Sequence, residues 1–430
     1  MRAATPRQDG RQDDDSAVTI PQQCQRCRNT TNDTATFLWQ HRGSERLHTR
    51  GMRARLVNCV SGAGVHKNEE RQMGGERYLY AYFHGDEQLD DDQQVRFAIS
   101  DDALHWKSLH GGRPVLCSHE GDGGVRDPFL IRLPQGGFVL IATDLQIKNP
   151  RYVTPERSAW DQAQIIGSHD IVIWRSDDLV HWRGPQFVDV AGGHPIGNVW
   201  APKATFVAER GAYLVYWAST CSNDDYCKNR IYACWSVDFT EFSPMFTLIA
   251  REHSCIDAEL TRIADGRWVL YMKNESDKTV GIYVSPRLFD EDSTVGTVET
   301  GTIGGSAEGF SKVTKEVVGR RAGKFVGELS SVGQLSRVFT RVDQPQISAL
   351  RGVEGPCAVT RGNDVVLYLD EYMGAKRGYM PFIGDDPTRA ASFESSEPSQ
   401  YCMPDGARHG SVLTITSKEA ELLESVYGIQ

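Results

Sequence analysis

Two patterns of hydrophobic and polar residues divide the chain near residue 75. Residues 1–74 are rich in Arg, Gln, Asp, Thr and Asn and show neither the two-residue period of a strand nor the 3.6-residue period of a helix. We predict that this segment is disordered, or is an extension that does not belong to the folded protein. Residues 75–430 alternate short apolar runs with clusters of Gly, Asp and Pro, and we expect them to form one domain.

The apolar runs after residue 75 predict strands. They are short, rich in Val, Ile, Tyr, Phe and Trp, and bounded by residues that favour turns. Examples are RYLYAYF at 77–83, FVLIATD at 138–144, AYLVYWAS at 212–219, WVLYMKN at 268–274 and VVLYLDEY at 365–372. Because no segment has the pattern of a long amphipathic helix, the expected class is all-β.

An internal repeat indicates the number of structural units. An apolar strand is followed by Ser, Asp and then an aromatic residue, as in FAISDDALHW at 97–106 and VIWRSDDLVHW at 172–182. Counting weaker copies, the marker positions are Ser100, Ser176, Ser236, Ser285 and Gly384. A repeat of ~50–75 residues that holds several strands is typical of a propeller blade. Five copies predict a five-bladed β-propeller with antiparallel four-stranded blades, in which the C-terminal strand closes the first blade.

A second set of five motifs comes before apolar strands at blade spacing. They are VRDPFLIR at 125–132, VWAPKATF at 199–206, CIDAELTR at 255–262, VEGPCAVT at 353–360 and RHGSVLTI at 408–415. The innermost strands of a propeller converge on its axis, so their first residues meet although they are distant in sequence. Asp127, Asp257 and Glu354 would therefore share one mouth. Converging carboxyl groups are what hydrolysis of a glycosidic bond requires.

The motifs RDP, WAP, IDA, EGP and RHG, in this order, resemble those of glycoside hydrolase family 43, whose members are five-bladed propellers acting on arabinosides and xylosides. The resemblance covers residues 76–424 and is closest to the arabinofuranosidase and β-xylosidase branch. It implies an inverting, exo-acting enzyme in which Asp127 is the general base and Glu354 the general acid. Asp257 would hold the acid and raise its pKa.

The resemblance implies no required cofactor. His409 matches a histidine near the axis that helps to bind a metal ion in some relatives. A structural, calcium-like cation in the central channel is therefore the one metal that the resemblance suggests, with His409 beside it.

Two departures from the family pattern concern the site. Lys203 stands where relatives have the Glu of WAPE, which predicts a changed wall of the substrate pocket. The segment 310–350 lengthens the interval between Asp257 and Glu354 and is interpreted as an insertion at the rim. It also makes Glu308 a rival for the general acid, although the EGP motif and the strand after it favour Glu354.

Three more residues are predicted to bind substrate. Trp200 starts an inner strand beside the mouth, Arg126 precedes the predicted base, and Trp160 lies in the long segment 146–169. For the two tryptophans, packing within the fold is the alternative role.

Composition restricts the partners. The 47 basic and 57 acidic side chains give a net charge of −10, which argues against a nucleic-acid or anionic-membrane binder. No apolar run approaches the ~18 residues of a membrane span, and the N-terminus has no apolar signal segment. We therefore expect a cytoplasmic protein that binds neither nucleic acid nor membranes. The resemblance implies that its partners are oligosaccharides containing arabinose or xylose.

Two alternatives stay open at this point. A β-fructofuranosidase-type propeller also uses RDP, but it needs an NDPNG-like nucleophile and a Glu-Cys acid, which the sequence lacks. A non-catalytic sugar-binding propeller would share the fold, but it would have no need for all three carboxylates.

Overall fold

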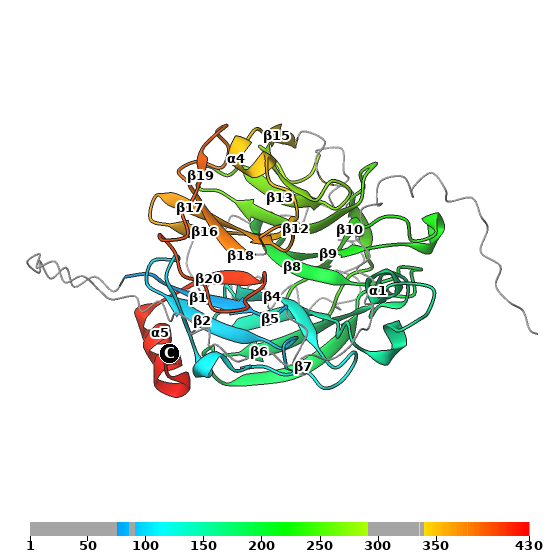
Figure 1. Cartoon of the computed structure of the whole chain (residues 1–430), viewed down its shortest axis with the longest axis horizontal. Coiled ribbons are helices and arrows are strands. Elements are labelled where there is room, and N and C mark those ends of the chain that lie inside the picture. Colours follow the sequence, from blue (N-terminus) through cyan, green and yellow to red (C-terminus); the bar gives the residue numbers. More distant parts are fainter. Residues whose placement is uncertain (1–74, 86–90, 291–334, 336–338, 376, 430) are drawn as a thin grey trace, which may run out of the picture. The chain divides into compact units, whose positions relative to one another are not determined.

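Five antiparallel four-stranded sheets follow one another along the chain, and their inner strands lie around one centre (Figure 1). The computed structural model describes residues 75–85, 91–290, 335, 339–375 and 377–429. Each sheet is one blade of a β-propeller, which confirms the predicted class, blade number and strand number.

Every blade extends from an inner strand near the axis to an outer strand at the periphery. In this order, blade 1 contains β20 (Ser411–Ile415), β1 (Arg77–Tyr82), β2 (Arg96–Ser100) and β3 (Trp106–Ser108). Blade 2 contains β4 (Val125–Arg132), β5 (Phe138–Asp144), β6 (Asp170–Ser176) and β7 (Trp182–Asp189). Blade 3 contains β8 (Trp200–Val207), β9 (Ala212–Ser219), β10 (Arg230–Ser236) and β11 (Phe246–Ile249). Blade 4 contains β12 (Cys255–Arg262), β13 (Trp268–Asn274), β14 (Thr279–Ser285) and β15 (Thr340–Val342). Blade 5 contains β16 (Val353–Arg361), β17 (Asp364–Glu371), β18 (Gly378–Gly384) and β19 (Phe393–Ser395).

Helices are few in the described residues; most lie between strands, and α5 follows the last strand. The α-helices of the described residues are α1 (Ala159–Ile166), α4 (Pro345–Ser348) and α5 (Ser417–Tyr427). Short 3-10 helices cover His110–Gly112, Pro150–Tyr152, Ala208–Arg210 and Ser222–Asp224. None of the helices in the described ranges is both long and apolar enough to cross a membrane.

The ring of blades is closed by the two ends of the domain. The inner strands contact one another in the order β20, β4, β8, β12, β16 and back to β20. β20 pairs with β1 in antiparallel register, from Arg77 opposite Ile415 to Ala81 opposite Ser411. Because the last strand, β20, pairs with the first, β1, in one blade, the inner edge of β1 is not left unpaired. This is the closure predicted from the sequence.

The repeat found in the sequence marks the end of the third strand in every blade. Ser100, Ser176, Ser236, Ser285 and Gly384 are the last residues of β2, β6, β10, β14 and β18. In blade 2, Asp178 accepts the backbone N–H groups of Val180 at 3.0 Å and His181 at 2.8 Å. The Asp and aromatic residues of the repeat are therefore turn and packing residues.

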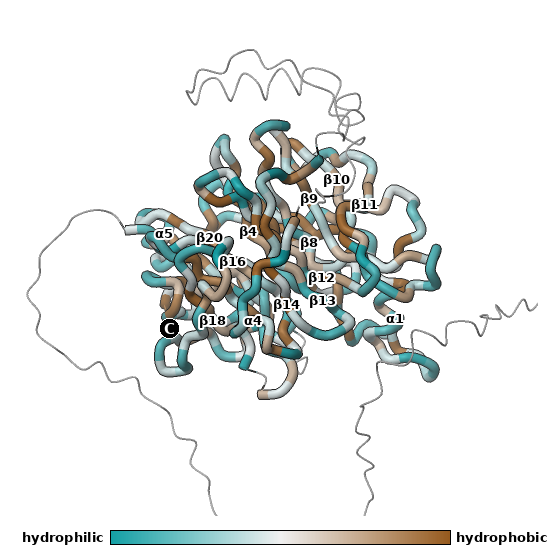
Figure 2. Tube along the Cα trace, turned by 90° about the horizontal axis from the view of Figure 1, so that it is seen from above, coloured by the Kyte–Doolittle hydropathy of each residue, from teal (hydrophilic) through white to brown (hydrophobic). Residues whose placement is uncertain are grey.

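Each interface between neighbouring blades has its own apolar core. Between blades 1 and 2, for example, Phe97, Leu140 and Trp174 are buried in one cluster, against which Trp182 packs. Blades 5 and 1 meet through a tyrosine-rich cluster that includes Tyr80, Tyr368 and Tyr379. Figure 2 shows hydrophobic stretches along the strands and hydrophilic ones at many outer loops.

Several sequence predictions fall partly or wholly outside the described residues. Residues 1–74, the rival acid Glu308 and residues 310–334 lie outside them. The end of the 310–350 segment is described, and it forms β15 and α4. This end is the outer strand of blade 4 and the helix that follows it, so the interpretation as a rim insertion is wrong for this part.

Removing residues 408–430 should leave the domain insoluble or unfolded, because β1 would lose its inner partner and expose an unpaired edge. The measurement is soluble yield and thermal melting. A chain ending after Tyr427 is the control, since it keeps β20 and α5. A soluble, cooperatively melting protein without residues 408–430 would contradict the closure.

Candidate active site

The inner strands of blades 2 to 5 contain the same β-bulge near their first residues. The register against the second strand shifts at matching places, for instance between Arg126 and Phe129 and between Glu354 and Cys357. Inside each shift one residue has a left-handed backbone, namely Asp127 (φ 54°), Ala201 (φ 48°), Asp257 (φ 51°) and Gly355 (φ 53°). Asp adopts this conformation more readily than most residues, and bulges commonly redirect side chains near active sites.

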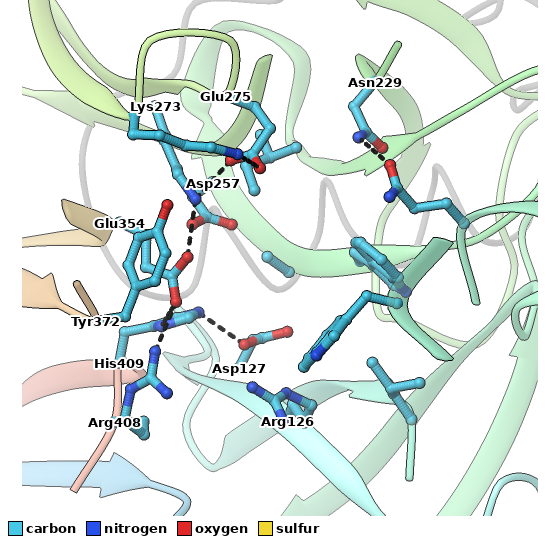
Figure 3. Close-up of a pocket in the computed structure, with 17 residues that line it drawn as sticks. Arg126, Asp127, Asn229, Asp257, Lys273, Glu275, Glu354, Tyr372, Arg408 and His409 are labelled. Atoms are coloured by element: carbon cyan, nitrogen blue, oxygen red, sulfur yellow. Dashed lines mark hydrogen bonds and ion pairs between the residues drawn. The ribbon is translucent and has the colours of Figure 1, made fainter. Parts of the chain in front are cut away.

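A cavity of about 420 Å³ lies at these bulges and is lined by residues of all five blades (Figure 3). The lining residues are Arg126, Asp127, Leu145, Trp160, Gln164, Trp200, Ala201, Asn229, Ile256, Asp257, Lys273, Glu275, Lys278, Glu354, Tyr372, Arg408 and His409. The structure thus brings together the predicted catalytic residues, the predicted substrate-binding residues and His409.

A continuous row of alternating acidic and basic side chains runs through the cavity wall, and we call it the charge row. Its members in order are Asp127, His409, Asp370, Arg408, Glu354, Lys273 and Glu275. Neighbours in the row are 2.6–3.0 Å apart, measured between nitrogen and oxygen atoms. His409, Asp370 and Lys273 are buried and the other four members are partly buried, so each charge depends on its neighbours for compensation.

Asp127 is the ionised end of this row. Its Oδ1 lies 2.7 Å from His409 Nε2, and its Oδ2 accepts a 2.7 Å hydrogen bond from the Thr143 hydroxyl. Thr143 Oγ1 in turn accepts the backbone N–H of Ala201, the left-handed residue of the next blade. Burial opposes ionisation of Asp127, but His409 and Arg126 outweigh it and lower its pKa.

His409 lies between two carboxylates and is a cation. Its Nε2 faces Asp127, and its Nδ1 lies 3.0 Å from Asp370 Oδ2, so both ring nitrogens carry protons toward acceptors. Burial disfavours the charged ring, but the attraction of Asp127 and the hydrogen bonds to Asp127 and Asp370 raise the pKa of His409 to about 10.

Glu354 is held as a carboxylate. Lys273 Nζ donates to its Oε2 at 2.8 Å, and Arg408 Nη2 donates to its Oε1 at 2.7 Å. Burial alone would raise the pKa of Glu354, but Lys273, His409 and Arg408 hold it well below the usual range. The sequence-based expectation of a raised pKa at Glu354 is therefore wrong for this state of the site.

Asp257 carries the raised pKa instead. The residue is buried, and its Oδ2 accepts the backbone N–H of Gly355 at 2.9 Å. Burial is the largest cause of the raised pKa, and the negative charges of Glu354 and Asp127 add to it against the attraction of His409 and Lys273. Of the three predicted carboxyl groups, Asp257 is the one whose environment favours the protonated form.

The residues around His409 do not fit a metal ion. Glu354, Asp370 and His409 come close enough together to be considered as ligands. However, a metal ligand needs a ring nitrogen with a free lone pair, and both nitrogens of His409 face carboxylates at hydrogen-bond distance. Arg408 already bridges Asp370 and Glu354. The predicted metal role of His409 is not supported by these contacts.

The predicted substrate-binding residues form one side of the cavity. Trp160 on α1 meets Trp200 edge to face, with 6.1 Å between ring centroids. The Arg126 guanidinium lies between the rings of Phe83, at 4.5 Å, and Trp160, at 4.9 Å. Trp160 remains 40% exposed, so its indole is accessible to a bound sugar.

Lys203 does not lie on the cavity wall, and the expectation that it changes this wall is wrong. The bulge position of blade 3 is Ala201, and Lys203 follows two residues further along β8. Lys203 is buried and binds Glu259 and the carbonyl of Pro356 instead.

Sequence reasoning missed Lys273, Asp370 and Arg408, which neutralise or hold the predicted catalytic groups. A signal was present for two of them. Thr143, Lys273 and Asp370 occupy the same position in the second strands of blades 2, 4 and 5. In each of these strands, the position lies two residues after the residue at which pairing with the inner strand resumes past the bulge. A polar residue at this place in an otherwise apolar run could have been noticed.

Comparison with known proteins identifies the family of the chain. The glycosyl hydrolase 43-related family, described as "Probable glycosyl hydrolase domain", matches residues 75–421. The chain belongs to this family.

Among curated proteins, an α-L-arabinofuranosidase of Bifidobacterium longum subsp. longum is 28% identical over 244 residues, which is 52% of this chain and 22% of that protein. The chain therefore spans about a fifth of the length of this relative. Among solved structures, a thermostable family-43 glycoside hydrolase is 15% identical, with a TM-score of 0.40 over 68% of this chain and 83% of that one. A GH43 β-xylosidase/α-arabinofuranosidase from a compost microbial metagenome is 12% identical, with a TM-score of 0.40 over 63% and 77% of the two chains.

Gly355→Ala should lower both the melting temperature and any activity of the site. A Cβ at Gly355 would lie 2.2 Å from His409 Cβ, so the imidazole would have to leave Asp127. The matched control is Gly362→Ala, which has a similar left-handed backbone (φ 60° against 53°) but no atom within 4 Å of the new Cβ. Equal losses in the two variants would mean that backbone strain alone is responsible.

The pair of His409 and Asp127 also predicts a pH dependence of stability. The unfolded pKa of a histidine is ~6.5, whereas that of His409 in the fold is raised to about 10. The stabilisation is therefore complete below the unfolded pKa and declines as pH rises through the folded one. The melting-temperature difference between the native chain and His409→Gln should shrink as pH rises across this window. A difference that grows instead would contradict the charged imidazole.

Proposed function

We propose that the chain is an inverting, exo-acting glycoside hydrolase that releases terminal arabinose or xylose from oligosaccharides. The supporting observation is that Asp127, Asp257 and Glu354 line one cavity in environments that shift their pKa values in different directions. Two carboxyl groups whose pKa values are pushed apart are the arrangement that acid–base cleavage of a glycoside needs.

Asp127 is assigned the role of general base. Its lowered pKa keeps it ionised, and the hydrogen bonds from Thr143 and His409 fix its orientation. It would remove a proton from a water molecule while that water attacks the anomeric carbon.

The proton for the leaving oxygen is assigned to the pair of Asp257 and Glu354. The two carboxyl groups interact, and the negative charge of Glu354 is one of the causes that raise the pKa of Asp257. Glu354 stands where the family resemblance places the general acid, so we assign it the delivery to the leaving oxygen. The bond between the anomeric carbon and that oxygen then breaks as water adds from the opposite face.

Inversion is proposed from the family resemblance, and it sets an expected distance between the two carboxyl groups. The ring of His409 separates the two carboxylates, with Nε2 2.7 Å from Asp127 Oδ1 and Nδ1 3.6 Å from Glu354 Oε1. Inverting enzymes leave ~6.5–9.5 Å between the two carboxyl groups for a water molecule, while retaining enzymes keep them ~5–5.5 Å apart. Direct attack by water therefore predicts a separation in the wider range between the carboxyl groups of Asp127 and Glu354.

The sugar type is proposed from the matched relative and from the cavity. The B. longum relative is described as an arabinofuranosidase. The volume of about 420 Å³ is within the range of small-ligand pockets, and the Trp160–Trp200 side offers an apolar face to a sugar ring.

Leaving-group chemistry tests the assignments. Asp127→Asn, Asp257→Asn and Glu354→Gln should each lower kcat by ~10²–10⁴ on natural oligosaccharides. With a dinitrophenyl arabinofuranoside or xyloside, whose leaving group needs no proton, Glu354→Gln should recover most of its rate and Asp127→Asn should not. Recovery by Asp257→Asn instead would make Asp257 the acid. Sugar binding without hydrolysis by the native chain would favour a binding protein.

NMR of the first-formed sugar tests the stereochemistry. The anomeric configuration should be inverted, because water attacks directly in the proposed mechanism. A retained first product would contradict the single displacement and favour a covalent intermediate, as in the β-fructofuranosidase alternative.

A further inference from the structure

Lys203 lies in a buried layer of side chains at the propeller axis. This layer is next to the one that lines the cavity. The residues that follow the bulges and resume pairing in blades 2 to 5 are Phe129, Lys203, Glu259 and Cys357. None of them lines the cavity. Lys203 and Glu259 are 5% and 4% exposed, so this layer holds a buried ion pair.

The ammonium group of Lys203 joins three blades through oxygen atoms. Its Nζ donates to Glu259 Oε2 on β12 at 2.6 Å and to the Pro356 carbonyl on β16 at 2.5 Å. On another side, the ring of Phe129 on β4 has its centroid 5.8 Å from Nζ. A residue of blade 3 therefore contacts groups from blades 2, 4 and 5.

Both carboxylate oxygens of Glu259 already have a partner within the described contacts. Its Oε2 binds Lys203, and its Oε1 accepts the backbone N–H of Ala358 at 2.8 Å. A Ca²⁺ ion needs about six to eight oxygen ligands, and it would be repelled by the ammonium already present.

We propose that Lys203 supplies the cation at the propeller axis of this protein. Its ammonium group holds the inner strands together in place of a metal ion in the channel. The layer then requires no divalent ion to hold the inner strands of blades 3, 4 and 5 together. The high pKa of Lys203 is consistent with this role, because Glu259 outweighs the effect of burial and keeps the amine charged.

The first experiment compares the native chain in EDTA, in CaCl₂ and in neither, and reads the melting temperature. This readout does not depend on the proposed hydrolase activity. We expect the same melting temperature in all three conditions. A fall in EDTA that CaCl₂ reverses would overturn the proposal, because a bound divalent ion would then support the fold.

The second experiment removes the ammonium. Lys203→Met leaves the Glu259 carboxylate buried without its cation, and the melting temperature should fall by on the order of 10 °C. Lys107→Met, at an exposed position of β3, is the matched control and should change little. The double variant Lys203→Met/Glu259→Gln should recover much of the loss, because no unpaired charge remains.

The last comparison asks whether the vacated position accepts a metal. Lys203→Ala opens space beside the Glu259 carboxylate and the Pro356 carbonyl, and CaCl₂ should raise the melting temperature of this variant while leaving the native chain unchanged. A Lys203→Met variant as stable as Lys107→Met would overturn the proposal. If the Lys203 variants do not fold, the EDTA comparison on the native chain still decides it.

Discussion

Burial of charge around a narrow axis is the constraint on which the site depends. Closing five blades brings the inner strands into contact, and the side chains at their bulges lose water. A buried ion without a partner costs several kcal/mol, about 3–5 when one member of a pair is removed. The charge row meets this constraint by placing a cation between each two carboxylates, from Asp127 to Glu275. Because its members come from blades 1, 2, 4 and 5, the row also couples the positions of those blades.

The same row separates the pKa values of the three predicted carboxyl groups. Asp127 and Glu354 each contact cations of the row and are held ionised, whereas Asp257 is outside it and receives a backbone N–H from Gly355. Its higher pKa follows from burial next to two negative charges. The geometry therefore differs from the simple expectation that the residue in the acid position has the raised pKa, because that shift occurs at Asp257 instead.

The fold could be predicted because its determinants repeat. The Ser-Asp-aromatic pattern ends the third strand in several blades, as at Ser100 and Ser176, and it fixes both the number of blades and their phase. The predicted site residues were found because inner-strand starts must converge. Lys273 and Arg408 could not be assigned in advance, since their effect on Glu354 depends on distances between blades. The prediction of a raised pKa at Glu354 is wrong for the same reason. The motifs contain the neighbouring carboxylate and Arg408, but only packing between blades brings Arg408 and Lys273 to Glu354.

Lys203 shows how one substitution is interpreted differently once its position along the strand is known. In the sequence it stands in a motif that begins a cavity-lining strand, which predicts a changed wall of the substrate pocket. The bulge at Ala201 shifts the pairing by one residue, so that Lys203 enters the layer beyond the cavity and faces Glu259. Both layers follow one rule, in which a cation from one blade is shared by acceptors of others. In the cavity layer this arrangement leaves carboxylates facing a space for a ligand, and in the buried layer it satisfies the charges completely within the protein.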